Sequence, residues 1–129
     1  MPLTYEVLPR EKIVYTLVTG NISLEEFKTF AEKLENDWEI NFPHFEIIDL
    51  TNLMDFELSR KSYGEISEHL KDYHNKKQRI GSIHIGVNPY SHTVGRMFCS
   101  LWEGAGYKSC TVGSFDEAME IVKRELGNK

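Results

Sequence analysis

Apolar residues recur along the chain with two periods, one typical of strands and one typical of helices. Short runs rich in β-branched and aromatic residues predict strands, because such side chains suit a pleated and partly buried surface. The predicted strands are Thr4–Leu8, Lys12–Thr19, Phe45–Leu50, Arg79–Val87 and Tyr107–Val112. Only Pro9, Arg10 and Glu11 separate the first two, and so short a connection predicts an antiparallel hairpin.

Between the strands, apolar residues return every three or four positions, which predicts amphipathic helices. Each predicted helix begins at a serine, a residue that caps helices by accepting a hydrogen bond from a backbone N–H of the first turn. These serines are Ser23, Ser59, Ser91 and Ser114. The second helix is expected over about Ser59–Tyr73 and the third over roughly His92–Gly104. The expected inner stripe of the first helix is Leu24, Phe27, Ala31, Leu34 and Trp38.

Strands that alternate with single helices imply right-handed crossovers and parallel neighbours. The predicted fold is therefore an α/β fold with a mixed five-stranded sheet, in which an N-terminal antiparallel hairpin precedes βαβαβα crossovers. A chain of 129 residues suits one domain spanning residues 1–129.

The composition of the chain argues against some classes of binding partner. A net charge of −5 argues against binding to nucleic acid or to an anionic membrane surface. No apolar run approaches the roughly 20 residues that cross a bilayer, so membrane insertion is not expected. The N-terminus lacks the pattern of a signal peptide. Cys99 and Cys110 have no metal-ligand spacing and are interpreted as reduced thiols, which predicts a cytoplasmic protein.

The stretch Phe45–Ser59 joins a predicted strand to a predicted helix, which is where α/β proteins often place binding sites. Asp49 is expected at the carboxyl end of this strand. Its carboxylate either lines a ligand crevice or accepts hydrogen bonds from the backbone of Thr51 and Asn52 and fixes the turn.

The start of the second predicted helix combines Ser59 with two basic neighbours, Arg60 and Lys61. Backbone N–H groups at a helix N-terminus favour negative charge, so these residues are candidates for an anion site. The alternative is a simple N-cap with two exposed basic side chains, whose small cost against the helix dipole is tolerable.

A second candidate cluster follows the strand Arg79–Val87. Its members are Tyr90, Ser91, His92 and Arg96. If both strand ends meet at one edge of the sheet, this cluster shares a crevice with Ser59 and suits a phosphate or carboxylate ligand. The alternative is a capped helix with polar surface residues.

Signs of catalysis are weak. The five histidines include no pair spaced for a metal, and the glycines form no phosphate-binding loop. No nucleophile elbow is present, and Cys99 is expected to point at the core. We therefore predict no metal, no cofactor and no enzymatic activity, with a weaker alternative in which His92 acts as an acid or base.

From about Ile13 to Leu126 the chain resembles a STAS domain, more narrowly the SpoIIAA-like group that includes STAS/SEC14-like proteins. The resemblance rests on the strand ending in Gly20, the capped helix at Ser23, the strand end Ile47–Leu50 and the closing segment Ser114–Met119. It implies a small mixed sheet with helices packed largely on one face, no metal, and usually no catalysis.

In the anti-sigma-factor antagonists of this family, the segment after the aspartate carries a serine that a partner kinase phosphorylates. The matching positions here are Asp49, Leu50, Leu53 and, after one extra residue, Phe56. Ser59 falls near the family's serine pair, but three neighbours depart from the pattern, namely Leu58, Arg60 and Lys61. This departure argues against an intact phospho-switch.

The leading hypothesis is thus a non-catalytic regulatory domain that binds a protein partner through Asp49–Lys61 and the following helix. The alternative, implied by the SEC14-like side of the resemblance, is a carrier or sensor of a small apolar or anionic ligand. The first strand is a candidate sheet edge, which leaves a homodimer open.

Overall fold

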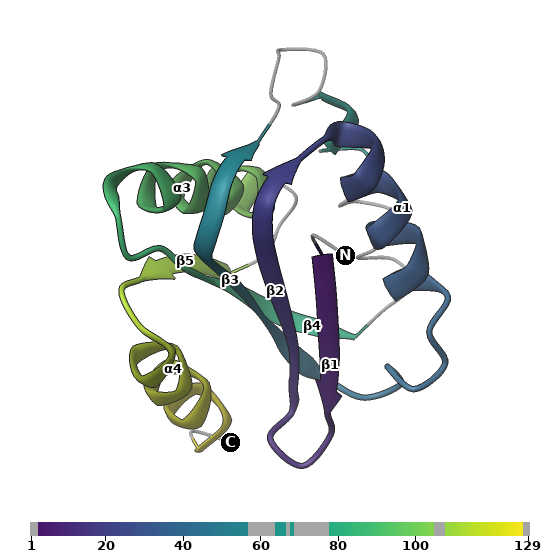
Figure 1. Cartoon of the computed structure of the whole chain (residues 1–129). Coiled ribbons are helices and arrows are strands. Elements are labelled where there is room, and N and C mark those ends of the chain that lie inside the picture. Colours follow the sequence, from purple (N-terminus) through teal and green to yellow (C-terminus); the bar gives the residue numbers. More distant parts are fainter. Residues whose placement is uncertain (1–2, 57–63, 67, 69–77, 105–107, 128–129) are drawn as a thin grey trace.

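The computed structural model describes residues 3–56, 64–66, 68, 78–104 and 108–127 (Figure 1). Its elements in chain order are β1 (Leu3–Leu8), β2 (Ile13–Ile22), α1 (Leu24–Glu35), β3 (His44–Phe56), β4 (Arg79–Ile85), α3 (Pro89–Gly104), β5 (Lys108–Val112) and α4 (Phe115–Gly127). Residues 64–66 and 68 are also helical. The predicted helix Ser59–Tyr73 otherwise lies outside the described residues.

The strands form one five-stranded sheet in the order β1-β2-β3-β4-β5. β1 pairs with β2 antiparallel, and the remaining neighbours are parallel. This arrangement confirms the mixed sheet with an N-terminal hairpin, because a short turn permits only antiparallel pairing whereas each later strand arrives by a helical crossover. β1 lies at one edge of the sheet, and its pairing with a second copy stays a prediction.

The helices cover the two faces of the sheet unequally. α1 and α3 pack on one face around a core that includes Leu50, Phe98 and Trp102. α4 packs on the other face, where Ala118 and Val122 meet the strands. Figure 1 shows α4 well separated from the layer of α1 and α3. The helices therefore lie largely on one face, with α4 as the exception.

β3 is longer than the sequence predicted, and this corrects the loop expected after Leu50. The strand runs on to Phe56 and pairs with an extension of β2 that continues through Gly20, at φ +71°, to Ile22. Register shifts in β2 accompany the extension. Leu53 and Phe56 are buried, whereas the residues between them are exposed. A strand with one exposed face has polar residues that resemble those of a loop, which explains why the sequence predicted a loop here.

The first helix is shorter than predicted. The predicted capping box is present, with the Ser23 hydroxyl accepting from the N–H of Glu26. α1 ends at Glu35, where Asn36 closes it, and Trp38 lies beyond the helix with 79% of its surface exposed. The expectation that Trp38 belongs to the inner stripe is therefore wrong, because its apparent helical spacing extends past the cap.

Candidate functional site

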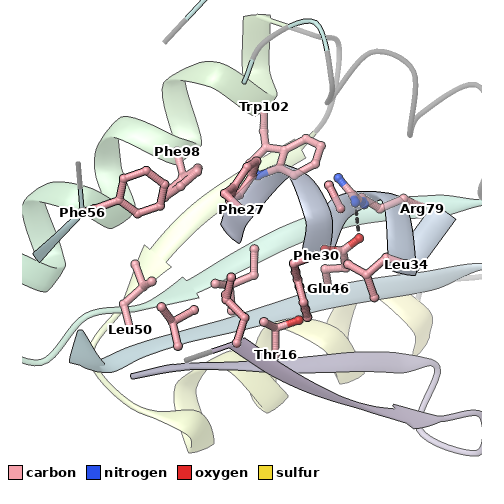
Figure 2. A pocket seen from close by; sticks show the side chains of 14 residues that line it. Thr16, Phe27, Phe30, Leu34, Glu46, Leu50, Phe56, Arg79, Phe98 and Trp102 are labelled. Carbon is pink, nitrogen blue, oxygen red and sulfur yellow. Dashed lines mark ion pairs between the residues drawn. The ribbon is translucent and has the colours of Figure 1, made fainter. Parts of the chain in front are cut away.

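A largely apolar cavity of about 50 Å³ lies between the sheet and the helices α1 and α3 (Figure 2). Its lining comes from strands β1 to β4 and from both helices. The lining residues are Leu3, Thr16, Val18, Phe27, Phe30, Ala31, Leu34, Glu46, Ile48, Leu50, Phe56, Arg79, Phe98 and Trp102. Alternation along a strand explains the pattern, since every second residue of β2 and β3 points to this face.

Aromatic rings close one end of the cavity. Phe27 stacks on Phe98 with ring centroids 5.8 Å apart, and Phe56 meets Phe98 edge-on at 5.5 Å. Each ring comes from a different element, namely α1, α3 and the end of β3. These packed rings make that end a fixed apolar wall.

A buried ion pair between Glu46 and Arg79 occupies the other end (Figure 2). The side chains are only 3% and 2% exposed, respectively, and the Arg79 guanidinium lies 3.8 Å from the centroid of the Trp102 ring. Adjacent parallel strands, β3 and β4, bring the two charges together. Because charges in an apolar interior are tolerated only when they are paired, each residue depends on the other.

Thr16 adds a hydroxyl to the cavity wall. Its side chain is buried, and within the described residues its Oγ1 has no hydrogen-bond partner. A hydroxyl offers one donor and two acceptor positions, and leaving them unused inside a protein is unfavourable. The cavity therefore combines an apolar majority with a few convergent polar groups, which is the usual composition of a ligand pocket.

Sequence reasoning missed this cavity. The available signal was Glu46, an acidic residue at an inward position of the otherwise apolar run Phe45–Ile48. A charge in such a place needs a partner, and Arg79 stands at the start of the next strand. Nothing in the linear pattern revealed that α1 leaves space above the sheet.

Asp49 lies within β3 rather than at its carboxyl end, which corrects the prediction. It points to the face opposite the cavity, where its carboxylate accepts hydrogen bonds from the Tyr15 hydroxyl at 2.5 Å and from the Thr51 N–H at 2.9 Å. Burial, followed by the hydrogen bond to Asp49, raises the pKa of Tyr15. Asp49 thus holds the backbone and a phenol in place.

Phe56 and Tyr90, two predicted site residues, are in contact. The Phe56 backbone N–H donates to the Tyr90 hydroxyl at 2.8 Å, and that hydroxyl donates to Asp55 at 3.1 Å. Burial is the main cause that raises the pKa of Tyr90. Tyr90, at the start of α3, thus contacts the carboxyl end of β3.

The other predicted site residues do not join the cavity. Ser91 is buried and is not the N-cap that the sequence predicted, because α3 begins at Pro89 and Ser91 lies in its first turn. The Asn88 side chain accepts from the Ser91 N–H at 2.9 Å, and the Ser91 hydroxyl accepts from the Asn88 N–H at 3.2 Å. Proline suits the first helical position because it lacks an N–H.

His92 and Arg96 are exposed on α3 and line a shallow groove beside β5. Ser59, Arg60 and Lys61 lie outside the described residues. The crevice predicted to unite Ser59 with His92 and Arg96 therefore stays a prediction, and the anion-binding role of these residues stays one as well.

A second buried polar cluster lies under α3. His84 Nδ1 is 3.5 Å from the sulfur of Cys99, whose sulfur is 3.1 Å from the Thr111 hydroxyl. Burial lowers the pKa of His84 to about 3, so its imidazole is neutral. Cys99 points at the core, as expected, and its thiol packs against this neutral ring.

The described residues lack two features that would indicate other functions. They contain no group of three or more histidine, cysteine, aspartate or glutamate side chains placed to hold a metal ion. No helix among them is both long and apolar enough to cross a membrane.

The sheet order, the N-terminal hairpin and the crossover helices together define a SpoIIAA-like fold. One similar solved structure is an uncharacterized protein of the DUF3478 family with a SpoIIAA-like fold from Shewanella loihica PV-4, with a TM-score of 0.62 and 16% identity over 93% of this chain and 91% of that one. This likeness confirms the fold that the sequence resemblance implied.

Two further similar structures are of SpoIIAA itself. The anti-sigma factor antagonist SpoIIAA in its unphosphorylated form matches with a TM-score of 0.53 and 13% identity, covering 94% of this chain and 97% of that one. The Bacillus cell fate determinant SpoIIAA in its phosphorylated form gives 0.50 and 14%, covering 93% and 98%. No protein-family model and no curated protein matches the sequence.

Proposed function

We propose that this chain is a non-catalytic, cytoplasmic regulatory domain that acts by binding a protein partner. The supporting observation is the SpoIIAA-like fold across nearly the whole chain, because one protein of that fold is an anti-sigma factor antagonist. Such a role requires a recognition surface rather than a reaction centre. Leu58, Arg60 and Lys61 depart from the phosphorylated segment of the anti-sigma-factor antagonists, which supports partner recognition without a phospho-switch.

We place the recognition surface at the carboxyl ends of β3 and β4, where Met54, Val87 and Tyr90 are 74%, 54% and 39% exposed. We call these three residues the carboxyl-end surface. Exposed apolar side chains at one end of a domain favour contact with another protein. This surface overlaps the predicted segment Asp49–Lys61 but excludes Asp49, whose carboxylate is engaged within the fold.

Affinity capture from the native host tests this proposal. The double variant Met54→Glu and Val87→Glu places charge on the carboxyl-end surface and is expected to lose the partners that the wild-type chain retains. Trp38→Glu is the matched control, because Trp38 is equally exposed but lies before β3, at the opposite end of that strand. Equal capture by both variants would show that the surface is placed wrongly.

The cavity favours a second candidate function, a carrier or sensor of a small molecule. A buried ion pair beside an apolar void is an unusual use of a core, and a ligand would explain why the space is kept.

Native mass spectrometry of the purified chain is expected to reveal a bound molecule under this second function. Ala31→Leu adds bulk to the cavity wall and should remove that molecule, whereas Thr29→Leu on an exposed position of the same helix should not. A spectrum of bare protein under all gentle conditions would contradict the carrier function.

A further inference from the structure

We infer that the cavity takes an uncharged amphipathic molecule, whose polar group hydrogen-bonds Thr16 beside the Glu46–Arg79 pair and whose hydrocarbon part lies toward Phe56 and Phe98. This inference rests on the second function proposed above, that of a small-molecule carrier or sensor, and names its ligand class.

The cavity has two chemically distinct ends. Figure 2 shows Glu46 and Arg79 at one end and Leu50, Phe56 and Phe98 at the other, with Thr16 between them on the sheet side. A ligand that is polar throughout would leave hydrogen-bonding groups against the rings, and a pure hydrocarbon would leave the Thr16 hydroxyl unsatisfied. The layout therefore fits a molecule with one polar end and one apolar end.

The charge balance excludes an ionised head group. Glu46 and Arg79 carry opposite charges, form an ion pair and are almost wholly buried, so their sum at the cavity wall is zero. An anionic ligand would bring a charge without a counter-charge into this apolar space and would compete with Glu46 for Arg79. Because an unpaired buried charge is strongly unfavourable, an uncharged head group is preferred.

The Thr16 hydroxyl supplies the recognition of that head group. Among the described residues nothing hydrogen-bonds its Oγ1, although the side chain is buried and lines the cavity. An alcohol or an amide can donate to this hydroxyl or accept from it, and a ketone can accept from it, in each case without adding charge.

The size of the cavity limits what fits. A volume of about 50 Å³ holds roughly four water-sized groups, at about 10–15 Å³ each. A short-chain molecule therefore enters with modest adjustment. Longer chains need the cavity between α1 and the sheet to widen.

Fluorescence of Trp102 provides the test. The chain has two tryptophans, and Trp38→Phe removes the exposed one, leaving Trp102 on the cavity wall as the reporter. The probes are 1-hexanol and hexanoate at pH 7, which share a chain length and differ in head-group charge. We expect 1-hexanol to change the emission saturably and hexanoate to bind at least tenfold more weakly.

Two Thr16 variants, each made in the Trp38→Phe chain, test whether the Thr16 hydroxyl binds the head group. Thr16→Val keeps the shape and deletes the hydroxyl, so 1-hexanol should bind about fivefold more weakly, as for the loss of one net hydrogen bond. Thr16→Ser keeps a hydroxyl and should bind like the parent, which separates recognition from any general loss of folding.

The possible outcomes separate a wrong ligand class from a wrong carrier or sensor function. Hexanoate binding as tightly as 1-hexanol, or Thr16→Val binding 1-hexanol unchanged, overturns the ligand class or its anchor while the carrier function stands. If neither probe alters Trp102 emission, the cavity is not a ligand site. The carrier or sensor function and the ligand class inferred here are then both wrong.

Discussion

The hydroxyl of Tyr90 accepts a hydrogen bond from the backbone N–H of Phe56 at 2.8 Å. β4 ends at Ile85, opposite Asp49, so beyond this point β3 has no partner strand on that side in the described register. A side chain at the start of α3 thus takes the place of a strand. Because the Phe56 ring lines the cavity, the bond links the cavity wall to the carboxyl-end surface.

Tyr90→Phe should lower the free energy of unfolding by about 1–2 kcal/mol, because the Phe56 N–H loses its acceptor while the ring is kept. Urea denaturation measures the change. Asp55→Ala serves as the control, since it removes only the exposed bond from the same hydroxyl and should cost less. A larger loss from Asp55→Ala would show that the exposed contact matters more.

Removing one member of the buried ion pair should be costly. Glu46→Met and Arg79→Met each leave an uncompensated charge in the core and are expected to lose about 3 kcal/mol of stability. The double variant should lose much less than the sum, since no charge is left behind. Additive losses in this double-mutant cycle would show that the two side chains act independently.

Acidification should destabilise the fold through His84. Burial lowers its folded-state pKa to about 3, whereas an unfolded histidine titrates near 6.5. Between these values the unfolded state binds a proton that the folded state does not. Stability should therefore fall as pH drops from about 6.5, by about 2 kcal/mol at pH 5, and this His84 contribution should be absent above pH 7.

Urea denaturation at pH 7 and pH 5 measures this dependence. In His84→Gln the histidine contribution disappears, so the variant should lose less stability on acidification than the wild type. His92→Gln, at an exposed position of α3, should keep the wild-type slope. If His84→Gln also keeps that slope, other groups cause the acid sensitivity.

Gly86→Ala should destabilise the fold by more than 2 kcal/mol, on the order of other overpacked cores. A Cβ there would lie 2.7 Å from the backbone nitrogen of His92, where α3 passes over the strand end. Gly104→Ala is the control, because a Cβ at that position meets nothing within 4 Å. Thermal unfolding compares the two, and similar melting temperatures would contradict the close packing.

The sequence predicted the fold well because local and long-range signals agreed. Apolar runs, capping residues and the hairpin turn each pointed to the same element order, as the capping box at Ser23 illustrates. Helix and strand ends were less predictable. Trp38 continued a helical spacing that the cap at Asn36 had already ended, and Leu53 to Phe56 formed a strand whose exposed residues resembled a loop.

The candidate site was only partly predictable. Phe56 was nominated by the match to the family's segment and Tyr90 by its place after the strand Arg79–Val87, and the structure brings the two residues together. The pairing of Glu46 with Arg79 did not, because it depends on the register between β3 and β4 and on a cavity that α1 leaves above them. Register and empty space are properties of packing, and a single sequence records neither directly.

The strand order also shapes how the chain folds. Among the described strands, only β1 and β2 pair across a short turn, whereas every other pairing is parallel and spans a crossover. Hairpins form within about 1–10 μs, but contacts between distant segments must first overcome the entropy of loop closure. The rate-limiting step of folding should therefore be the insertion of β3 between β2 and β4. The strand that carries Glu46 and Phe56 thus sets both the shape of the cavity and the pace at which it is built.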